Sequence, residues 1–357
     1  MASSFSRSPL RVDIGHGRYQ ALIGVGGIGS GMFFALSGDH TLGREESRGG
    51  HFLDRRDYCK LHIISHYVKT LLGPDFAVTP LGQVGDDDAG HKLLDEMRQA
   101  DLEMRYVKCS PGDQTLFSFC FIYPDGSGGN LTTDDSACAR VDAACVAQAE
   151  PEFARFARRG VALAAPEVPL AARDRLLQLG TRYGFLRLAS CVAQEMSVAL
   201  EMDMLDRADL LAANVSEAAA AAGLPSELSP GSVSTAEIVK AAVARLREIN
   251  PKLLISITAG NQGSWSWDGQ ALTHVPAFPA EVVSTAGAGD AHLAGIIAGL
   301  VAGLPLSQAQ ELGALTAALS VTSPHTINKE IDRRSLGAFA ARIQALVCDA
   351  VRDLLRD

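Results

Sequence analysis

Residues 282–300 read VVSTAGAGDAHLAGIIAGL, and this stretch is the most informative about the fold. Its apolar start, Val282 and Val283, predicts a short strand, and the small residues after Asp290 predict a helix. Gly287 and Gly289 lie between the two, where glycine allows turns that other residues resist. Backbone N–H groups of such a turn converge at the positive end of the helix dipole, so the stretch predicts an anion hole.

Asp290 falls in the first turn of this predicted helix, beside the hole that Gly287, Ala288 and Gly289 would form. A carboxylate there is placed to accept a hydroxyl proton while the hole holds a phosphoryl group. The same residues, taken alone, are also compatible with a plain glycine turn and an ordinary acidic residue at a helix N-terminus.

Two other polar groups follow apolar runs that read as strands. Asn214 and Glu217 open a predicted helix, where they could reach a hydrated magnesium ion or simply form a capping box. Thr258, Gly260 and Gly263 follow the run KLLISIT, and they are compatible with a phosphate-binding turn or a tight turn between strands. Ligands of open α/β sheets bind at the carboxyl ends of the strands, which favours the binding interpretation.

Composition bounds the class of protein. The 357 residues are 47% hydrophobic and 20% charged, enough to bury a large core. A net charge of −9 argues against nucleic acid or an anionic membrane as a partner. The seven cysteines are scattered without a C-x-x-C pair, and the N-terminus lacks a secretory apolar region, so a reduced, cytoplasmic protein is expected. The apolar stretch 293–304 is too short to cross a bilayer.

From about residue 140, helices predicted at 142–158, 170–182 and 233–248 alternate with apolar strand candidates. This alternation predicts a Rossmann-like, mostly parallel sheet with helices on both faces. Residues 1–18 are polar and read as a flexible arm, and 19–357 read as one large domain. Strand-like runs joined by Pro-Gly and Asp-Gly turns predict a small antiparallel β lid from about 37–57 and 104–133.

Together, N-x-x-E at 214–217, T-x-G-x-x-G at 258–263 and T-x-G-A-G-D at 285–290 resemble the ribokinase-like (PfkB-type) carbohydrate kinases. The G-x-V-G-D-D run at 82–87 is similar to the same family. The resemblance covers about residues 19–350. It implies an ATP- and Mg2+-dependent kinase that phosphorylates a hydroxyl of a sugar or related small metabolite, with a lid over the substrate and a homodimer formed through that lid.

The resemblance also implies a role for each matching residue. Asp290 would be the catalytic base, and Gly287, Ala288 and Gly289 the anion hole. Magnesium would be bound through water by Asn214 and Glu217. The nucleotide would be bound by Thr258, Gly260, Gly263 and Thr285. The acceptor would be bound by Gly49, Gly50, Asp54 and Lys60.

The acceptor segment departs from the family pattern. The Gly-Gly motif of the family is usually followed within a few residues by an Asn that binds the sugar, but residues 51–62, after Gly49 and Gly50, contain no Asn. Asp54, Arg55 and Lys60 are there instead. These charged residues predict an anionic or otherwise functionalised acceptor rather than plain ribose or fructose. Ser284-Thr285-Ala286 replaces the Asp-Thr-Thr of many sugar kinases and leaves activation by a monovalent cation open.

Other patterns favour different functions. Gly24 to Gly29 matches the G-x-G-x-x-G fingerprint of dinucleotide-binding oxidoreductases, although residues 30–35 read as a strand rather than the required helix. A non-catalytic nucleotide sensor of the same fold is the other alternative. His62 and His66 could share a metal but lack an evident third ligand, and the Asp86–Asp88 run reads as a helix cap.

Overall fold

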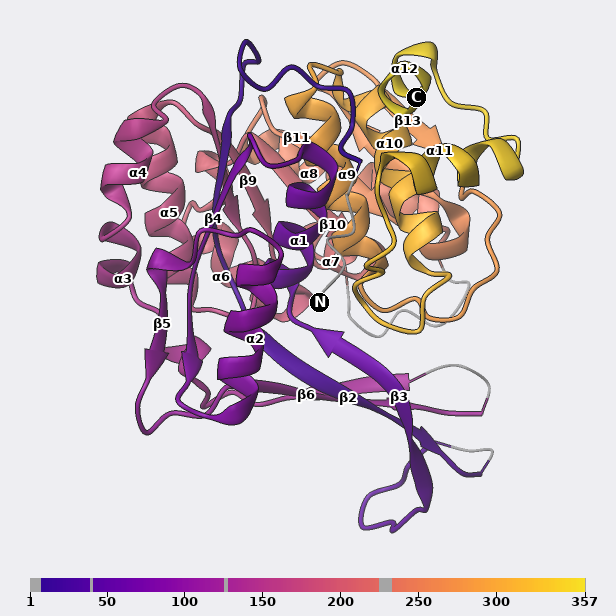
Figure 1. The fold of residues 1–357 in the computed structure, drawn as a ribbon. Coiled ribbons are helices and arrows are strands. Elements are labelled where there is room, and N and C mark those ends of the chain that lie inside the picture. Colours follow the sequence, from indigo (N-terminus) through magenta and orange to yellow (C-terminus); the bar gives the residue numbers. More distant parts are fainter. Residues whose placement is uncertain (1–7, 39–40, 125–127, 225–232, 357) are drawn as a thin grey trace, which may run out of the picture.

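The computed structural model describes residues 8–38, 41–124, 128–224 and 233–356. They form a nine-stranded sheet covered by helices on both faces, and a four-stranded sheet that projects from one end (Figure 1). The large sheet has the order β13-β12-β11-β10-β9-β8-β1-β4-β5. Its strands are β1 (Ala21–Val25), β4 (Ala77–Gly85), β5 (Val107–Ser110), β8 (Gly160–Ala164), β9 (Leu186–Ser190), β10 (Leu210–Asn214), β11 (Leu254–Thr258), β12 (Ser264–Trp267) and β13 (Leu272–Val275).

The large sheet is parallel from β5 to β11 and antiparallel at its β11-β12-β13 edge, which confirms the expected α/β class. All five residues of β1 are buried, because helices cover both faces. Alternation along the strand divides them: Leu22 packs into one core, whereas Ile23 and Val25 pack into the other.

The helices follow the strands in α/β order. One core contains α1 (Lys60–Leu72), α2 (Asp88–Gln99), α9 (Ala288–Val301), α10 (Leu306–Ser320), α11 (Arg333–Arg342) and α12 (Asp349–Leu355). The other contains α3 (Ala143–Ala147), α4 (Glu150–Arg155), α5 (Leu170–Tyr183), α6 (Met196–Glu201), α7 (Val215–Ala221) and α8 (Thr235–Ile249). The predicted helices at 170–182 and 233–248 agree with α5 and α8 within two residues, while 142–158 is broken into α3 and α4.

The small sheet has the order β3-β2-β6-β7 and consists of β2 (Gly29–Leu36), β3 (Gly50–Tyr58), β6 (Leu116–Ile122) and β7 (Gly128–Thr132). Its extent differs from the predicted lid. β2 belongs to it, whereas β5, inside the predicted 104–133 segment, joins the large sheet. The two outer pairs, β3-β2 and β6-β7, are antiparallel as expected. The central strands β2 and β6 are parallel, because both run outward from the large sheet in the same direction.

The described part of the predicted flexible arm, residues 8–18, is packed against the domain. Leu10 and Ile14 are buried in the core of α1 and α12, and the Leu10 N–H donates to the carbonyl of Leu71. Val12 also packs against this core, so apolar side chains at alternate positions hold the segment in place. Residues 1–7 lie outside the described part of the chain.

One local expectation is wrong, and one, the strand expected at residues 30–35, is confirmed. Val282 and Val283 form no strand: both are exposed, and residues 276–287 reach α9 as a loop. The glycine run from Gly24 to Gly29 leads into strand β2 and not into a helix, so it lacks the helix N-terminus that a dinucleotide fingerprint requires.

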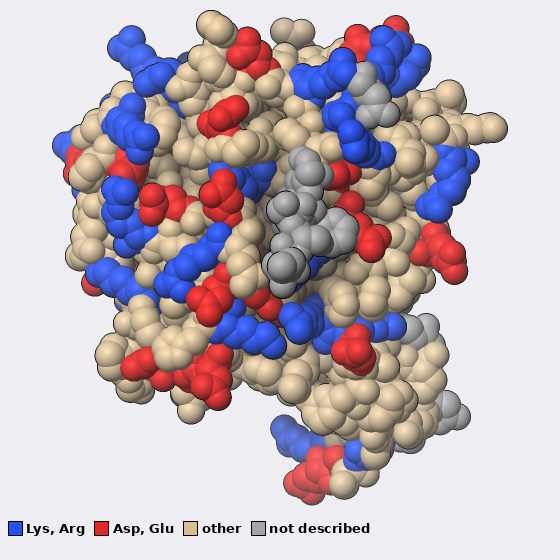
Figure 2. All heavy atoms as spheres, viewed as in Figure 1, with Lys and Arg blue, Asp and Glu red and all other residues tan. Residues whose placement is uncertain are grey.

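Among the described residues, every helix is too short or too polar to cross a membrane. On the face seen in Figure 2, Lys and Arg side chains are interspersed with Asp and Glu, and the described residues form no continuous basic surface there.

Candidate active site

The turn before α9 has the geometry of an anion site. Gly287 adopts φ 78°, and a Cβ there would lie 2.6 Å from the carbonyl oxygen of Thr326, so only glycine fits. The Ala288 N–H donates to the Thr285 carbonyl, while those of Gly289 and Asp290 lie in the first turn, which has no acceptor within the helix. A Cβ built on Gly289 meets nothing within 4 Å, so there is open space over this turn.

Asp290 is held beside a lysine from a distant part of the chain. The Lys60 ammonium, at the start of α1, lies 3.9 Å from the Asp290 carboxylate, whose side chain is only 14% exposed. Burial raises the pKa of Asp290, and the charge of Lys60 opposes that rise. Asp290 in turn raises the pKa of Lys60, which therefore stays protonated. The predicted acceptor residue Lys60 thus belongs to the immediate surroundings of the predicted base.

Sequence reasoning missed Glu167, which follows β8 and completes this group. Its carboxylate accepts the backbone N–H of Lys60 at 3.0 Å and so caps α1, whose own N-cap residue Cys59 makes no side-chain cap bond. Burial raises its pKa to about 7, against the lowering effect of Lys60. A Cβ on Gly27 would lie 2.3 Å from this carboxylate, so the glycine run after β1 makes room for Glu167.

Asp57, near the end of β3, is a further acidic group next to the site. Burial raises its pKa to about 6, the nearby charge of Asp290 raises it further, and a bond from the Cys120 thiol at 3.5 Å opposes the shift. The side chains of Asp57, Glu167, Asp290 and Lys60 therefore act on one another's ionisation.

Asn214 and Glu217 form the capping box at the start of α7 that the sequence left as one of two interpretations. Asn214 Oδ1 accepts the Glu217 N–H at 2.9 Å, and Glu217 Oε2 accepts the Asn214 N–H at 2.8 Å. Glu217 is 7% exposed, and its pKa is raised by burial and lowered by the Asn214 N–H and by Lys60. The cap uses one carboxylate oxygen, so the other remains for an ion or its water shell.

Thr258 lies next to this capping box, and Gly260 and Gly263 follow it in the sequence. Thr258 ends β11 directly opposite Asn214 of β10. Gly260 has φ 54° with open space around its Cα, which suits close approach of a ligand. Gly263 has a structural reason of its own: a Cβ there would lie 2.1 Å from the Val275 carbonyl. Thr285 is exposed, and its carbonyl accepts the Ala288 N–H before α9.

The structure does not bring three of the predicted acceptor residues to Asp290. Gly49 and Gly50 are both exposed, and Gly50 begins β3, eight strand positions and so about 26 Å from the end of that strand at Tyr58. Asp54 lines a separate cavity of about 620 Å3 between β3 and the segment 322–330. Of the predicted acceptor residues, Lys60 alone lies at the base.

The pair His62 and His66 does not form a metal site with a third ligand among the described residues. Both imidazoles are buried on α1, with ring centroids 6.5 Å apart. Burial lowers the pKa of His62 to about 4, so it is a neutral core residue.

Comparison with known sequences finds mainly proteins named as kinases. The family model described as pfkB family carbohydrate kinase matches residues 65–333. A fructokinase of Klebsiella pneumoniae is 27% identical over 256 residues, covering 66% of this chain and 78% of the relative. An uncharacterized sugar kinase YegV of Escherichia coli is 50% identical over 52 residues, covering 15% of this chain and only 16% of the relative. A fructoselysine 6-kinase of Shigella flexneri is 37% identical over 67 residues, covering 19% and 26%.

Solved structures share the fold at low identity. A ribokinase of Giardia lamblia matches with TM-score 0.73 and 16% identity over 89% of this chain and 99% of its own. A Burkholderia thailandensis nucleoside kinase in complex with inosine matches with TM-score 0.69 and 17% identity over 90% and 98%. The family model covers most of the chain, including Asn214, Thr258 and Asp290. On this ground the chain belongs to the pfkB family of carbohydrate kinases.

Proposed function

We propose that this protein transfers the γ-phosphoryl group of ATP to a hydroxyl of a sugar or related polyhydroxylated metabolite. The observation that carries the proposal is the position of Asp290: its carboxylate lies 3.9 Å from the Lys60 ammonium and directly follows Gly289, which has open space beside it. Phosphoryl transfer needs positioning and charge stabilisation more than covalent chemistry, and this arrangement offers both.

In this proposal Asp290 accepts the proton of the acceptor hydroxyl as that oxygen attacks phosphorus. The N–H groups of the Gly287–Gly289 turn and the dipole of α9 stabilise the charge on the transferred group. Thr258, Gly260, Gly263 and Thr285 line the nucleotide side. Glu217 and Asn214 fit a hydrated Mg2+, because only one carboxylate oxygen of Glu217 is used in the capping bond. When bound, Mg2+ would neutralise negative charge on the phosphates.

The charges around the base favour a neutral polyol over the anionic acceptor that the sequence predicts. The only lysine of this group is paired with Asp290, and Asp57 and Glu167 are acidic. Buried carboxylates accept hydrogen bonds from hydroxyls and repel phosphates and carboxylates. Asp57 and Glu167 are therefore proposed to bind acceptor hydroxyls, and Asp54 is left out of the site.

ADP formation tests this function. The protein with MgATP is incubated with a panel of neutral sugars, polyols, nucleosides and sugar acids, and ADP and phosphorylated product are both measured. Acceptor-dependent product, best with an uncharged polyol, is expected. ADP binding without product from any acceptor would instead favour a non-catalytic nucleotide sensor. A strong preference for sugar acids would overturn the proposal that the acceptor is uncharged.

Substitution of Glu217 by Gln separates its two roles. Glutamine keeps a carbonyl oxygen that can accept the Asn214 N–H, so the melting temperature should change little, whereas loss of the charge should raise the Mg2+ concentration needed for half-maximal rate several-fold. A lowered melting temperature with normal Mg2+ dependence would leave Glu217 as a helix cap only, with a cost of about 1 kcal/mol.

We also propose that a second copy of the chain covers the small sheet. Phe52 packs edge to face against both Phe34 and Phe119 on this sheet, and it is 59% exposed. Sedimentation velocity is expected to show a dimer that Phe52→Ser dissociates, while Val198→Ser, at an apolar residue on α6 that is 45% exposed, does not. A monomeric wild-type chain would contradict this proposal.

A further inference from the structure

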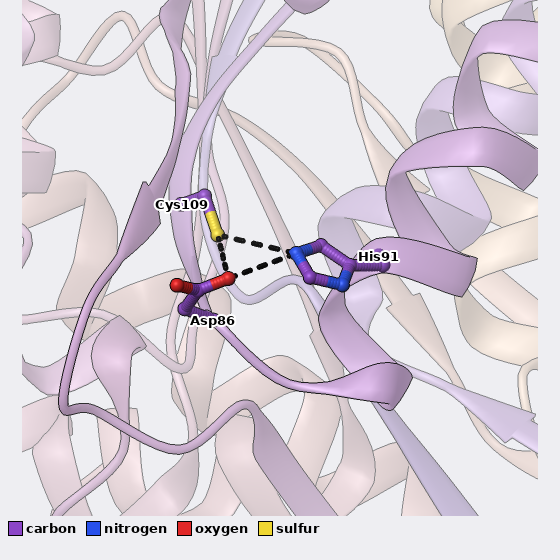
Figure 3. A group of neighbouring side chains, drawn as sticks. All are labelled: Asp86, His91 and Cys109. Atoms are coloured by element: carbon purple, nitrogen blue, oxygen red, sulfur yellow. Dashed lines mark hydrogen bonds and ion pairs between the residues drawn. The ribbon is translucent and has the colours of Figure 1, made fainter.

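Asp86, His91 and Cys109 place three different metal-binding atoms close together on the surface (Figure 3). His91 Nε2 lies 2.9 Å from Asp86 Oδ1 and 3.9 Å from the Cys109 sulfur, and that sulfur lies 3.5 Å from the same carboxylate oxygen. Among the described residues, this is the one group of three such side chains within ligand-sharing distance. None of the three belongs to the candidate active site.

The fold creates this group from three separate elements. β4 and β5 are parallel neighbours, which brings Cys109 opposite Val84, two residues before Asp86. Asp87 caps α2 by accepting the Gly90 N–H at 2.7 Å and also binds Thr115. Asp86, the residue before this cap, faces His91 near the start of α2.

An acid-base relay does not explain the arrangement. In a Cys-His-Asp triad, the two partners bond opposite nitrogens of the imidazole. Here Asp86 and Cys109 both face Nε2 of His91, as the dashed lines in Figure 3 show. Three donor atoms therefore point at one common position rather than forming a chain.

The separations of these atoms are close to those of a tetrahedral metal site. Zinc bonds of about 2.3 Å to sulfur and about 2.0 Å to nitrogen and oxygen put tetrahedral ligands about 3.3 to 3.6 Å apart. The observed distances of 2.9, 3.5 and 3.9 Å differ from these by about half an ångström or less, within reach of side-chain rotation. A thiolate and a carboxylate also neutralise a dication.

We propose that Asp86, His91 and Cys109 bind one divalent transition-metal ion of the zinc class, with water as the fourth ligand. Thiolate and imidazole ligands select zinc or cobalt over magnesium and calcium, so this site is distinct from a magnesium site at Glu217. The ion would tie β5, the edge strand of the large sheet, to the turn between β4 and α2.

A cobalt titration tests the site directly. The full-length protein is freed of metal with a chelator and titrated with Co2+ under reducing conditions. One equivalent is expected to produce a thiolate-to-cobalt charge-transfer band and the intense visible bands of tetrahedral cobalt, both displaced by Zn2+. Cys109→Ser should abolish the charge-transfer band and His91→Gln should weaken binding at least tenfold, while Cys348→Ser, which removes a half-buried thiol elsewhere, should bind as wild type.

Alkylation provides a second readout. Cys109 is exposed, so iodoacetamide should modify it in the metal-free protein, and stoichiometric Zn2+ should slow that reaction at least tenfold at this cysteine, measured by peptide mass spectrometry. Circular dichroism confirms that each variant is folded before it is compared. Absence of a saturable one-equivalent cobalt spectrum, or equal alkylation of Cys109 with and without Zn2+, would overturn the proposal.

Discussion

Asp290→Asn is expected to lower kcat by about two to four orders of magnitude, the range that loss of a general base produces. Asparagine has nearly the same shape, so the α9 turn keeps its structure, but its amide cannot accept the hydroxyl proton. Nucleotide affinity should change little, because the proposed anion hole consists of backbone N–H groups of residues 287–289.

Steady-state kinetics with the best acceptor and calorimetric titration with ADP together check this prediction. Glu167→Gln is a useful comparison, because it alters a carboxylate that contacts the Lys60 N–H and not the proposed base. Near-normal turnover of the Asp290 variant would remove this residue as the base, and a parallel loss of ADP affinity would point to a distorted turn instead.

Lys60→Met should move the acid limb of the kcat profile to higher pH by about one unit or more. Lys60 lowers the pKa of Asp290, so loss of the ammonium raises that pKa. Since the base must be ionised to work, the variant loses activity at pH values where the wild type is still fully active. The size follows from two charges 3.9 Å apart in partly screened surroundings, where their attraction exceeds the ~1.4 kcal/mol of one pKa unit.

The Lys60→Arg variant controls for this effect, because it keeps the charge and should restore most of the wild-type profile. If Lys60 instead bound an anionic acceptor group, Lys60→Met would raise the acceptor KM and leave the acid limb of kcat in place. A profile unchanged in both respects would show that the 3.9 Å pair has no catalytic consequence.

Local patterns were enough to predict the elements that carry the site. Strands β10 and β11 lie where apolar runs predict them, because their apolar side chains are buried. Helix α9 begins where the glycines predict it, because Gly287 adopts a positive φ that favours glycine. The Asn214–Glu217 capping box is likewise a contact between residues three apart. Such interactions are readable from spacing alone.

The missing parts depend on contacts between distant residues. Glu167 reaches the site only because it fills the space left by Gly27 and caps α1, and the sole local signal was an acidic residue after an apolar strand. The sequence groups Lys60 with Gly49 and Gly50 as acceptor residues, but the length of β3 separates Lys60 from the two glycines. The β2–β6 pairing joins segments more than eighty residues apart, and nothing in either segment specifies a parallel partner.

Transfer of label from ATP carrying a radioactive γ-phosphate tests the central claim most directly. The wild-type chain and Asp290→Asn are incubated with Mg2+ and the best neutral acceptor, and the products are separated. The account predicts label on an acceptor hydroxyl with the wild type and a loss of at least a hundredfold in the variant, in keeping with general-base catalysis. Label recovered only as inorganic phosphate, or transferred equally well by the variant, would contradict it.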